Sequence, residues 1–580
     1  MLTAHSTSVG GGASYAATMA DATGSTHDMP DQMPDNVVVI LLDSLNRHML
    51  GAYGSAEFDT PNLDRFARRA SQFHSHVTGS LPCMPARHDI LVGSLDFLWK
   101  PWGSIELWEE SITASLRRAD VTTMLVSDHP HLFETGGENY HVDFSGWDYV
   151  RGHEGDPWKT SVDPSAHGAP TIEPAERPLI RNAADGGWFL RDQVGVADRS
   201  FGRRHYDDSR TWFRTEEDFP GPRTMASAAA WLQHASQAHD RWMLFVDEFD
   251  PHEPFDTPDP WASMYDDGPL TADELETGRL VWPPYIVGGT STGKITERQA
   301  RQIRNNYGAK LSMIDHHFGK VLDQLDAQGL WDTTAVVVCT DHGHYLGDVR
   351  STGTAGNDSA ADIWGKPAIP QFEPLGHTPL MIHWPGSTRR EVRALSTNVD
   401  IHATIADAFG VVAGHRTHGR SLVPLLTGKT DSVRDWAIGG VYGNWVQVTD
   451  GRRKYARAPV EANMPLSMWS NRWSTMPTHR GLEDYMRFPN PDRRAYLDFM
   501  PGSDVPVIRQ PFTAGDTLPF WAAGARNEGQ HHLYDLDIDP DETENRRDEG
   551  GVEGEMIDLL RTALVDVEAP DEQLARLGIA

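Results

Sequence analysis

Five short, unbroken apolar runs constrain the fold of this chain more than any other feature. They lie at residues 37–42, 123–126, 242–246, 335–339 and 379–382. Runs of this kind are typical of strands that are buried on both faces of a parallel sheet. Segments with helical spacing lie between them, and the clearest begins at the N-cap candidate Thr296 and extends to about Gln328. Strands that alternate with helices predict an α/β fold, with a mostly parallel sheet flanked by helices.

Acidic residues follow four of these runs. Asp43, Asp128, Asp247 and Asp341 each come at or just after the end of a predicted strand. In open α/β sheets the ligand site lies outside the carboxyl ends of the strands. A single acid at such a position is more often a helix N-cap or a turn residue. Four together indicate a site.

Composition divides the chain into three parts. Residues 1–34 are mostly Gly, Ser, Thr, Ala, Asp and Met, without the basic and apolar segments of a secretory signal, so we expect a disordered leader on a cytoplasmic protein. Residues 35–430 hold the predicted sheet and form the main domain. Residues 431–580 contain Trp-, Pro- and Arg-rich stretches and a predicted helix over 556–565, which indicates a smaller C-terminal α+β subdomain.

The charge balance excludes some classes of partner. The 580 residues include 83 Asp and Glu against 51 Lys and Arg, for a net charge of -32. Such a surface repels phosphate backbones and anionic lipids, so we expect neither nucleic acid nor a membrane as the main partner. No window approaches the roughly 18 apolar residues of a spanning helix. With only Cys83 and Cys339, the chain has no disulfide framework and no cysteine-based zinc site.

Cys83 begins the sequence Cys-Met-Pro-Ala-Arg, which ends at Arg87. Pro85 suits the first turn of a helix, and the following residues are compatible with a helix to Val92. A side chain at this point lies near free backbone N–H groups and the positive end of the helix dipole, where an anion is stabilised. Arg87, one turn later, could make a forked contact with the same anion. A lone cysteine is otherwise more often a small buried hydrophobe.

The pattern Cys83-x-Pro85-x-Arg87 resembles the C-x-P-x-R signature of the sulfatase family, within the alkaline phosphatase superfamily. The similarity continues in order through residues 36–43, 60–64, 340–343, 365–366, 379–386 and 533–545. It implies an alkaline-phosphatase-like fold. It also implies that a formylglycine-generating enzyme oxidises Cys83 to formylglycine (3-oxoalanine), whose hydrated aldehyde is the nucleophile. One hydroxyl then attacks sulfur or phosphorus, and the other later expels the product.

The same resemblance implies a metal site. Its ligands would be Asp43, Asp341, His342 and the modified Cys83, and the usual family metal is calcium. Oxygen-rich sites of this kind also suit magnesium or manganese. Lys366 matches the family lysine that contacts the oxygens of the transferred anion, where a lone surface lysine is the plainer interpretation.

Four histidines match family positions around the substrate. His252 corresponds to the general acid that faces the leaving group, a role suited to a side chain that titrates near neutrality. An exposed turn histidine is the alternative there. His131 takes the part of a family histidine near the nucleophile, and His129 is a candidate for the place of a family lysine, although both also fit a solvated loop. His377 stands where the family often carries an arginine, and is a candidate substrate contact.

Three functions fit these features. The first is hydrolysis of a sulfate monoester by attack of the hydrated aldehyde at sulfur. The second uses the same site on phosphonate monoesters or phosphodiesters, because Ser44 in place of a second acid, and His342 in place of Asn, resemble that branch of the superfamily. The third is a metal-binding pseudoenzyme, which would need neither a nucleophile nor an acid. The leaving group stays open, and a Trp-rich C-terminal region suits a homo-oligomer.

Overall fold

The computed structural model describes residues 33–134, 136–162, 179–181, 188–190, 199–269, 271, 279–351, 360–367, 369–460, 463–472, 494–514, 530–547 and 550–580. The predicted leader thus lies almost entirely outside the described residues. Within them, no helix has the length and the apolar character that crossing a membrane requires.

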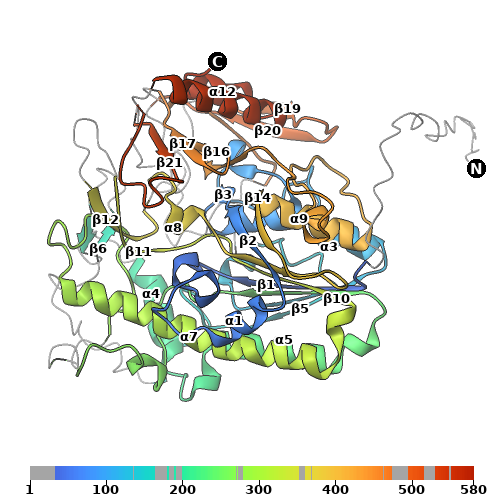
Figure 1. Cartoon of the computed structure of the whole chain (residues 1–580), viewed down its shortest axis with the longest axis vertical. Helices are drawn as coiled ribbons and strands as arrows, with labels where there is room; N and C mark the ends of the chain where they lie inside the picture. Colours follow the sequence, from blue (N-terminus) through green and yellow to red (C-terminus); the bar gives the residue numbers. More distant parts are fainter. Residues whose placement is uncertain are drawn as a thin grey trace, which may run out of the picture.

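An eight-stranded sheet forms the centre of the molecule (Figure 1). All five predicted strands belong to it, namely β1 (Asn36–Leu42), β4 (Thr122–Ser127), β8 (Trp242–Glu248), β10 (Thr334–Cys339) and β13 (Leu380–His383). The order is β14-β2-β13-β10-β1-β8-β4-β5, where the additional strands are β2 (Ser71–Val77), β5 (Gly146–Tyr149) and β14 (Glu391–Thr397). β13 is antiparallel to both of its neighbours, and the other pairings are parallel. The predicted α/β fold is confirmed.

Helices cover both faces of this sheet because alternate residues of each strand point to opposite sides. Val37, Val39 and Leu41 of β1 pack in the core with α2, α3 and α9, which span Cys83–Val92, Ile112–Arg118 and Asn398–Phe409. Val38 and Ile40 pack on the other side with α1, α5 and α7, which span Pro61–Ala67, Pro220–His234 and Glu297–Ala327. The strand β1 is therefore apolar and buried from Val37 to Leu42.

The long helix α7 begins where the sequence predicts. The Thr296 side chain accepts a hydrogen bond from the backbone N–H of Gln299, and the Gln299 side chain accepts one from the backbone N–H of Thr296, which completes a capping box. The predicted C-terminal helix is also present, as α12 (Gly550–Asp566).

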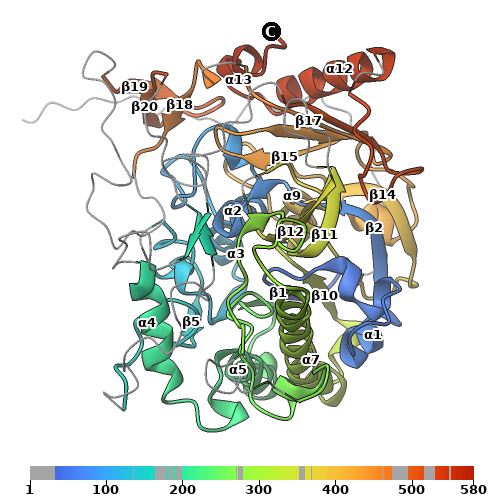
Figure 2. The same cartoon turned by 90° about the vertical axis from the view of Figure 1, so that its left-hand side faces the viewer.

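A second sheet lies beyond the carboxyl end of the first, under α12 (Figure 2). Its order is β21-β17-β16-β15-β3. Four strands come from the predicted C-terminal subdomain, namely β15 (Ala437–Val441), β16 (Val446–Thr449), β17 (Arg453–Arg457) and β21 (His532–Asp535). The fifth, β3 (Ser80–Leu81), pairs in parallel with β15 directly before Cys83. The second sheet therefore fixes the chain that leads into α2.

The remaining described strands form two small sheets and one hairpin. The hairpin consists of β6 (Leu179–Arg181) and β7 (Trp188–Leu190). One of the sheets contains β11 (Tyr345–Ser351), β12 (Ala360–Gly365) and β9 (Ile286–Val287), and it ends just before Lys366. The other contains β18 (Ser467–Trp469), β20 (Pro506–Pro511) and β19 (Tyr496–Phe499).

Candidate active site

Cys83 is the first residue of α2 and lies in a buried position between the two large sheets. Its Sγ is 3.3 Å from Nε2 of His342 and 4.0 Å from Nζ of Lys366. Burial raises the pKa of the Cys83 thiol well above its ordinary value, although Lys366 opposes the shift. The unmodified side chain is therefore a neutral thiol, which is a weak nucleophile.

The ligand set that the resemblance implies comes together in space. Single ligand atoms of Asp43, Cys83, Asp341 and His342 all lie within 4.8 Å of one another, and the four residues are buried. Asp43 follows β1, whereas Asp341 and His342 follow the adjacent β10. These residues come from three distant parts of the sequence, so no local pattern shows that they lie close together.

The donor atoms of this cluster fit a divalent cation. Oδ2 of Asp43 is buried, and it accepts no hydrogen bond from the described residues. Nη2 of Arg87 lies 2.9 Å away, close enough for an ion pair but without hydrogen-bond alignment. Carboxylate oxygens and an imidazole nitrogen are ordinary ligands of such cations.

Arg87 is fully buried at the centre of three carboxylates. Its Nε and Nη2 donate to Asp247 over 2.8 and 2.7 Å, and Nη1 donates to Oδ2 of Asp341 over 2.8 Å. Burial lowers the pKa of Arg87, but Asp247, Asp43 and Asp341 more than compensate and hold it well above its ordinary value. The expected forked contact thus exists, but Asp247 receives it and Cys83 contributes only its backbone carbonyl.

Asp247 is a site residue that the sequence indicated only as a strand-end acid. Three buried carboxylates face one guanidinium, which leaves an excess of negative charge in a water-poor region. Such an excess is costly unless a cation compensates it. A divalent ion beside Asp43 and Asp341 would balance it.

Lys366 approaches the same point from the end of β12. Its Nζ donates to Oγ of Ser44 over 3.3 Å. Ser44 in turn donates through Oγ to Asp43 (2.8 Å) and through its backbone N–H to Asp341 (3.1 Å). Burial lowers the pKa of Lys366, but Cys83, Glu253 and the nearby aspartates outweigh it and raise the pKa above its ordinary value. The buried side chain therefore carries a positive charge next to Cys83.

His252 lies beyond Lys366 with one nitrogen held and one open. Nδ1 donates to the backbone carbonyl of Glu253 over 2.7 Å, and the ring stacks on Phe249 with centroids 4.2 Å apart. None of the described residues bonds to its Nε2. Burial lowers the pKa of His252 well below its ordinary value, and Lys366 adds to the shift.

His129 and His131 have different environments. His129 is fully buried with its Nε2 4.0 Å from Oδ2 of Asp43, and burial followed by Arg87 lowers the pKa of His129 well below its ordinary value. His131 is held between Glu134 and Glu154, with Nε2 3.3 Å from Glu154. Burial lowers the pKa of His131, but the two carboxylates outweigh it and raise the pKa to about 10. The neutral His129 is the one beside the candidate metal-binding cluster.

His377 has partners of its own away from the cluster. Its Nδ1 lies 2.6 Å from Oε2 of Glu373, and its Nε2 lies 2.7 Å from the carbonyl of His74. Both ring nitrogens are therefore engaged by the protein.

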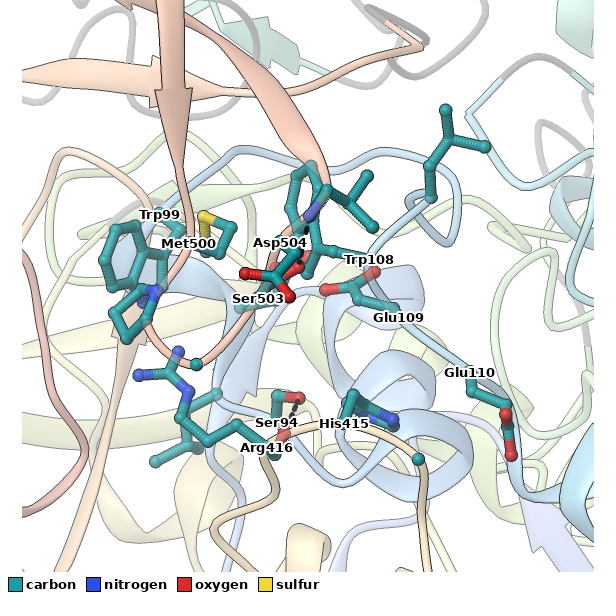
Figure 3. A pocket seen from close by; sticks show the side chains of 17 residues that line it. Ser94, Trp99, Trp108, Glu109, Glu110, His415, Arg416, Met500, Ser503 and Asp504 are labelled. Carbon is teal, nitrogen blue, oxygen red and sulfur yellow. Dashed lines mark hydrogen bonds between the residues drawn. The ribbon is translucent and has the colours of Figure 1, made fainter. Parts of the chain in front are cut away.

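A second group of possible ligands, His88, Asp96 and Glu109, has a cation of its own. Nζ of Lys100 lies 3.2 Å from Asp96 and 3.5 Å from Glu109. Beside this group is a cavity of about 340 Å³, whose lining includes Trp99, Trp108, Arg416 and the turn between β19 and β20 (Figure 3). Because the chain supplies the ammonium group, this cluster has less need of a metal.

The model of the family described as Sulfatase matches residues 35–411. The chain belongs to the sulfatase family. As a member it is a sulfuric ester hydrolase. Among curated relatives, it is 26% identical over 453 residues to the choline-sulfatase of Rhizobium meliloti, covering 73% of this chain and 78% of that protein. It is 24% identical to the multifunctional alkaline phosphatase superfamily protein PehA of Trinickia caryophylli, covering 69% and 78%.

Solved structures agree on the fold of this sulfatase. The phosphonate monoester hydrolase of Agrobacterium radiobacter aligns with a TM-score of 0.56 at 17% identity, over 92% of this chain and 95% of that one. BT4656, solved with its substrate D-glucosamine-2-N,6-O-disulfate, aligns with a TM-score of 0.55 at 14% identity, over 93% and 99%. At these identities the likeness concerns the fold alone, and it confirms the alkaline-phosphatase-like architecture.

The Arg87 cluster leads to a prediction about stability. We expect Arg87→Ala to lower the free energy of unfolding by about 3–5 kcal/mol, because it leaves buried carboxylates without their cation. Arg65→Ala is the matched control, since Arg65 pairs with Asp323 and Asp326 at the surface and its loss should cost less than about 1 kcal/mol. Urea denaturation of both variants measures the difference, and equal small losses would contradict this view of Arg87.

Proposed function

We propose that this sulfatase hydrolyses a small sulfate monoester with formylglycine at position 83 and one divalent cation, calcium before magnesium or manganese. The observation that carries the proposal is the gathering of Cys83, Asp43, Asp341 and His342 within 4.8 Å. A formylglycine-generating enzyme would be the partner for maturation. The choline-sulfatase relative and the disulfated glucosamine bound to BT4656 support a small sulfated substrate.

The neutral thiol of Cys83 supports the need for oxidation at this position. Burial keeps the pKa of the thiol high, so the unmodified residue lacks a reactive thiolate. A hydrated aldehyde at the same point would supply two hydroxyl groups. One attacks sulfur while the ester S–O bond breaks, and the other later loses its proton as the aldehyde re-forms and sulfate leaves.

The residues around Cys83 divide the remaining work. A bound divalent cation would acidify the attacking hydroxyl and neutralise charge on the sulfate group. Lys366, 4.0 Å from Sγ, would hold the sulfate oxygens. His252 would donate a proton through its open Nε2 to the leaving oxygen. Arg87 would keep the carboxylates of Asp43 and Asp341 in place.

The first prediction concerns the modification of Cys83. We expect protein from a host with the maturation enzyme to contain formylglycine at position 83, which mass spectrometry of the tryptic peptide can measure. Cys83→Ala should abolish turnover. Cys339→Ala should retain it at a modest cost in stability, because Cys339 is a buried hydrophobe at the end of β10. Active enzyme that contains only unmodified cysteine would contradict the proposal.

The second prediction concerns the metal. We expect Asp43→Ala and Asp341→Ala to lose both the bound divalent ion, measured by elemental analysis, and activity. Lys366→Ala should keep the ion and slow turnover by about 10²–10³. Asp96→Asn is the matched control, because Lys100 compensates that acid and its change should leave the metal content unaltered. If only Asp96→Asn lost the metal, the ion would bind at the group of His88, Asp96 and Glu109, and this prediction would be wrong.

The third prediction separates the possible substrates. We expect an aryl sulfate to be hydrolysed faster than an aryl phosphonate monoester or an aryl phosphodiester, each measured at saturating calcium and at saturating manganese. A phosphonate that outruns the sulfate by a wide margin would favour the alternative phosphonate monoester or phosphodiester hydrolase. Binding of sulfate esters without any turnover, in protein that carries formylglycine, would favour the pseudoenzyme.

A further inference from the structure

Glu253 contacts His252, which the proposed function assigns to the leaving group, and its charge acts on Lys366, which the proposed function assigns to the sulfate. The residue is 5% exposed, although a carboxylate at such depth is costly. Its carboxylate accepts a hydrogen bond from the hydroxyl of Tyr285. Burial raises the pKa of Glu253, but Lys366 and His344 outweigh it and lower the pKa below its ordinary value. Glu253 therefore carries a buried negative charge.

The same residue holds His252 in two ways. Its backbone carbonyl accepts from Nδ1 of His252 over 2.7 Å, and Oε2 of its carboxylate lies 3.4 Å from that nitrogen. Oε2 has no hydrogen-bond donor in the described part of the chain. The proton is thereby fixed on Nδ1, and Nε2 is the nitrogen left for the substrate.

Phe249 restricts the ring plane of His252. The two rings stack at 4.2 Å with 24° between their planes. Phe249 is itself held by His129 at 4.6 Å and by His153 at 4.7 Å. His252 thus has little freedom to turn away from its contact with Glu253.

A proton donor in this position faces an electrostatic problem. Burial and Lys366 both disfavour the imidazolium form of His252, and a neutral imidazole with its proton on Nδ1 has none to give from Nε2. A negative charge close to Nδ1 stabilises the imidazolium. The positive or titratable groups that disfavour the imidazolium of His252 are Lys366, His129, His153 and His344. Glu154 favours it through its charge, and Glu253 favours it through the hydrogen bond to its backbone carbonyl and places Oε2 3.4 Å from Nδ1. Of these two carboxylates, Glu253 is the one in direct contact.

We propose that Glu253 is the positioning residue that makes His252 a proton donor, because its carboxylate stabilises the imidazolium and its backbone carbonyl fixes the reactive nitrogen. This inference rests on the proposed function of the site. It assigns Glu253 no contact with the reacting atoms.

Leaving-group dependence tests the role of Glu253. We expect Glu253→Gln, which keeps an acceptor for Tyr285, to slow hydrolysis of phenyl sulfate by about 10² and that of 4-nitrophenyl sulfate by less than about threefold, since the better leaving group needs no proton. In a His252→Ala background the same change should alter neither rate by more than about threefold, because the two residues act as one unit. Glu253→Asp should restore part of the loss.

The result that would overturn the proposal is an equal loss on both esters, or a loss that adds fully to that of His252→Ala. A second measurement does not depend on turnover. In protein labelled with ¹⁵N-histidine, with His252→Ala used to assign the signal, we expect the proton of neutral His252 on Nδ1 and a lower pKa of His252 in Glu253→Gln. If the titration of His252 is the same in the wild type and in Glu253→Gln, the role of Glu253 is contradicted, even if sulfate esters prove not to be substrates. If the titration changes as expected but the wild type hydrolyses no sulfate ester, the result counts against the proposed function alone.

Discussion

The rest of the site depends on the ion pairs between the buried guanidinium of Arg87 and three carboxylates. Asp43, Asp247 and Asp341 end three adjacent strands of the central sheet, and without a cation their charges would repel one another in a region closed to water. From one turn inside α2, Arg87 donates hydrogen bonds to Asp247 and Asp341 and forms an ion pair with Asp43. Since Cys83 begins the same helix, the ion pairs that stabilise the buried acids also set the position of Cys83 relative to them.

The described residues contain two groups of possible metal ligands, and these groups differ in where their compensating positive charge comes from. In the group of Asp96 and Glu109, the ammonium of Lys100 is covalently tied to the chain and donates to a backbone carbonyl as well. Such a cation cannot exchange with ions in solution. Around Asp43 the chain supplies too little positive charge, and a buried carboxylate oxygen keeps free coordination capacity. That shortage of positive charge suits the cluster around Asp43 to binding a cation.

The histidines near the nucleophile share one residue type but differ in charge state. His131 is held by two carboxylates and has a pKa of about 10, whereas burial lowers the pKa of His129 and His252. Their neighbours rather than their identity decide whether each ring is a cation, a neutral contact or a proton donor. In the proposed role, the negative charge of Glu253 opposes the effect of Lys366 on the His252 ring.

The sequence by itself determined the main strands and helices, and through the family resemblance it named the members of the candidate metal-binding cluster. The five strands, the start of α7 and the helix that follows Cys83 are local properties, because periodicity and capping act over a few residues. The acids at the strand ends were visible for the same reason. Their positions at strand ends indicated one site at the carboxyl edge of the sheet, and the resemblance then placed Asp43 and Asp341 in a single ligand set.

Only the tertiary structure decided which of these groups pair. The fork of Arg87 to Asp247 spans 160 positions and the bond from Ser44 to Asp341 spans 297, so no window of sequence contains both partners. The opposite pKa shifts of His129 and His131 and the partners of His377 depend on burial and on groups brought from distant segments. These are properties of the assembled molecule, because the energy of a buried charge is set by everything packed around it.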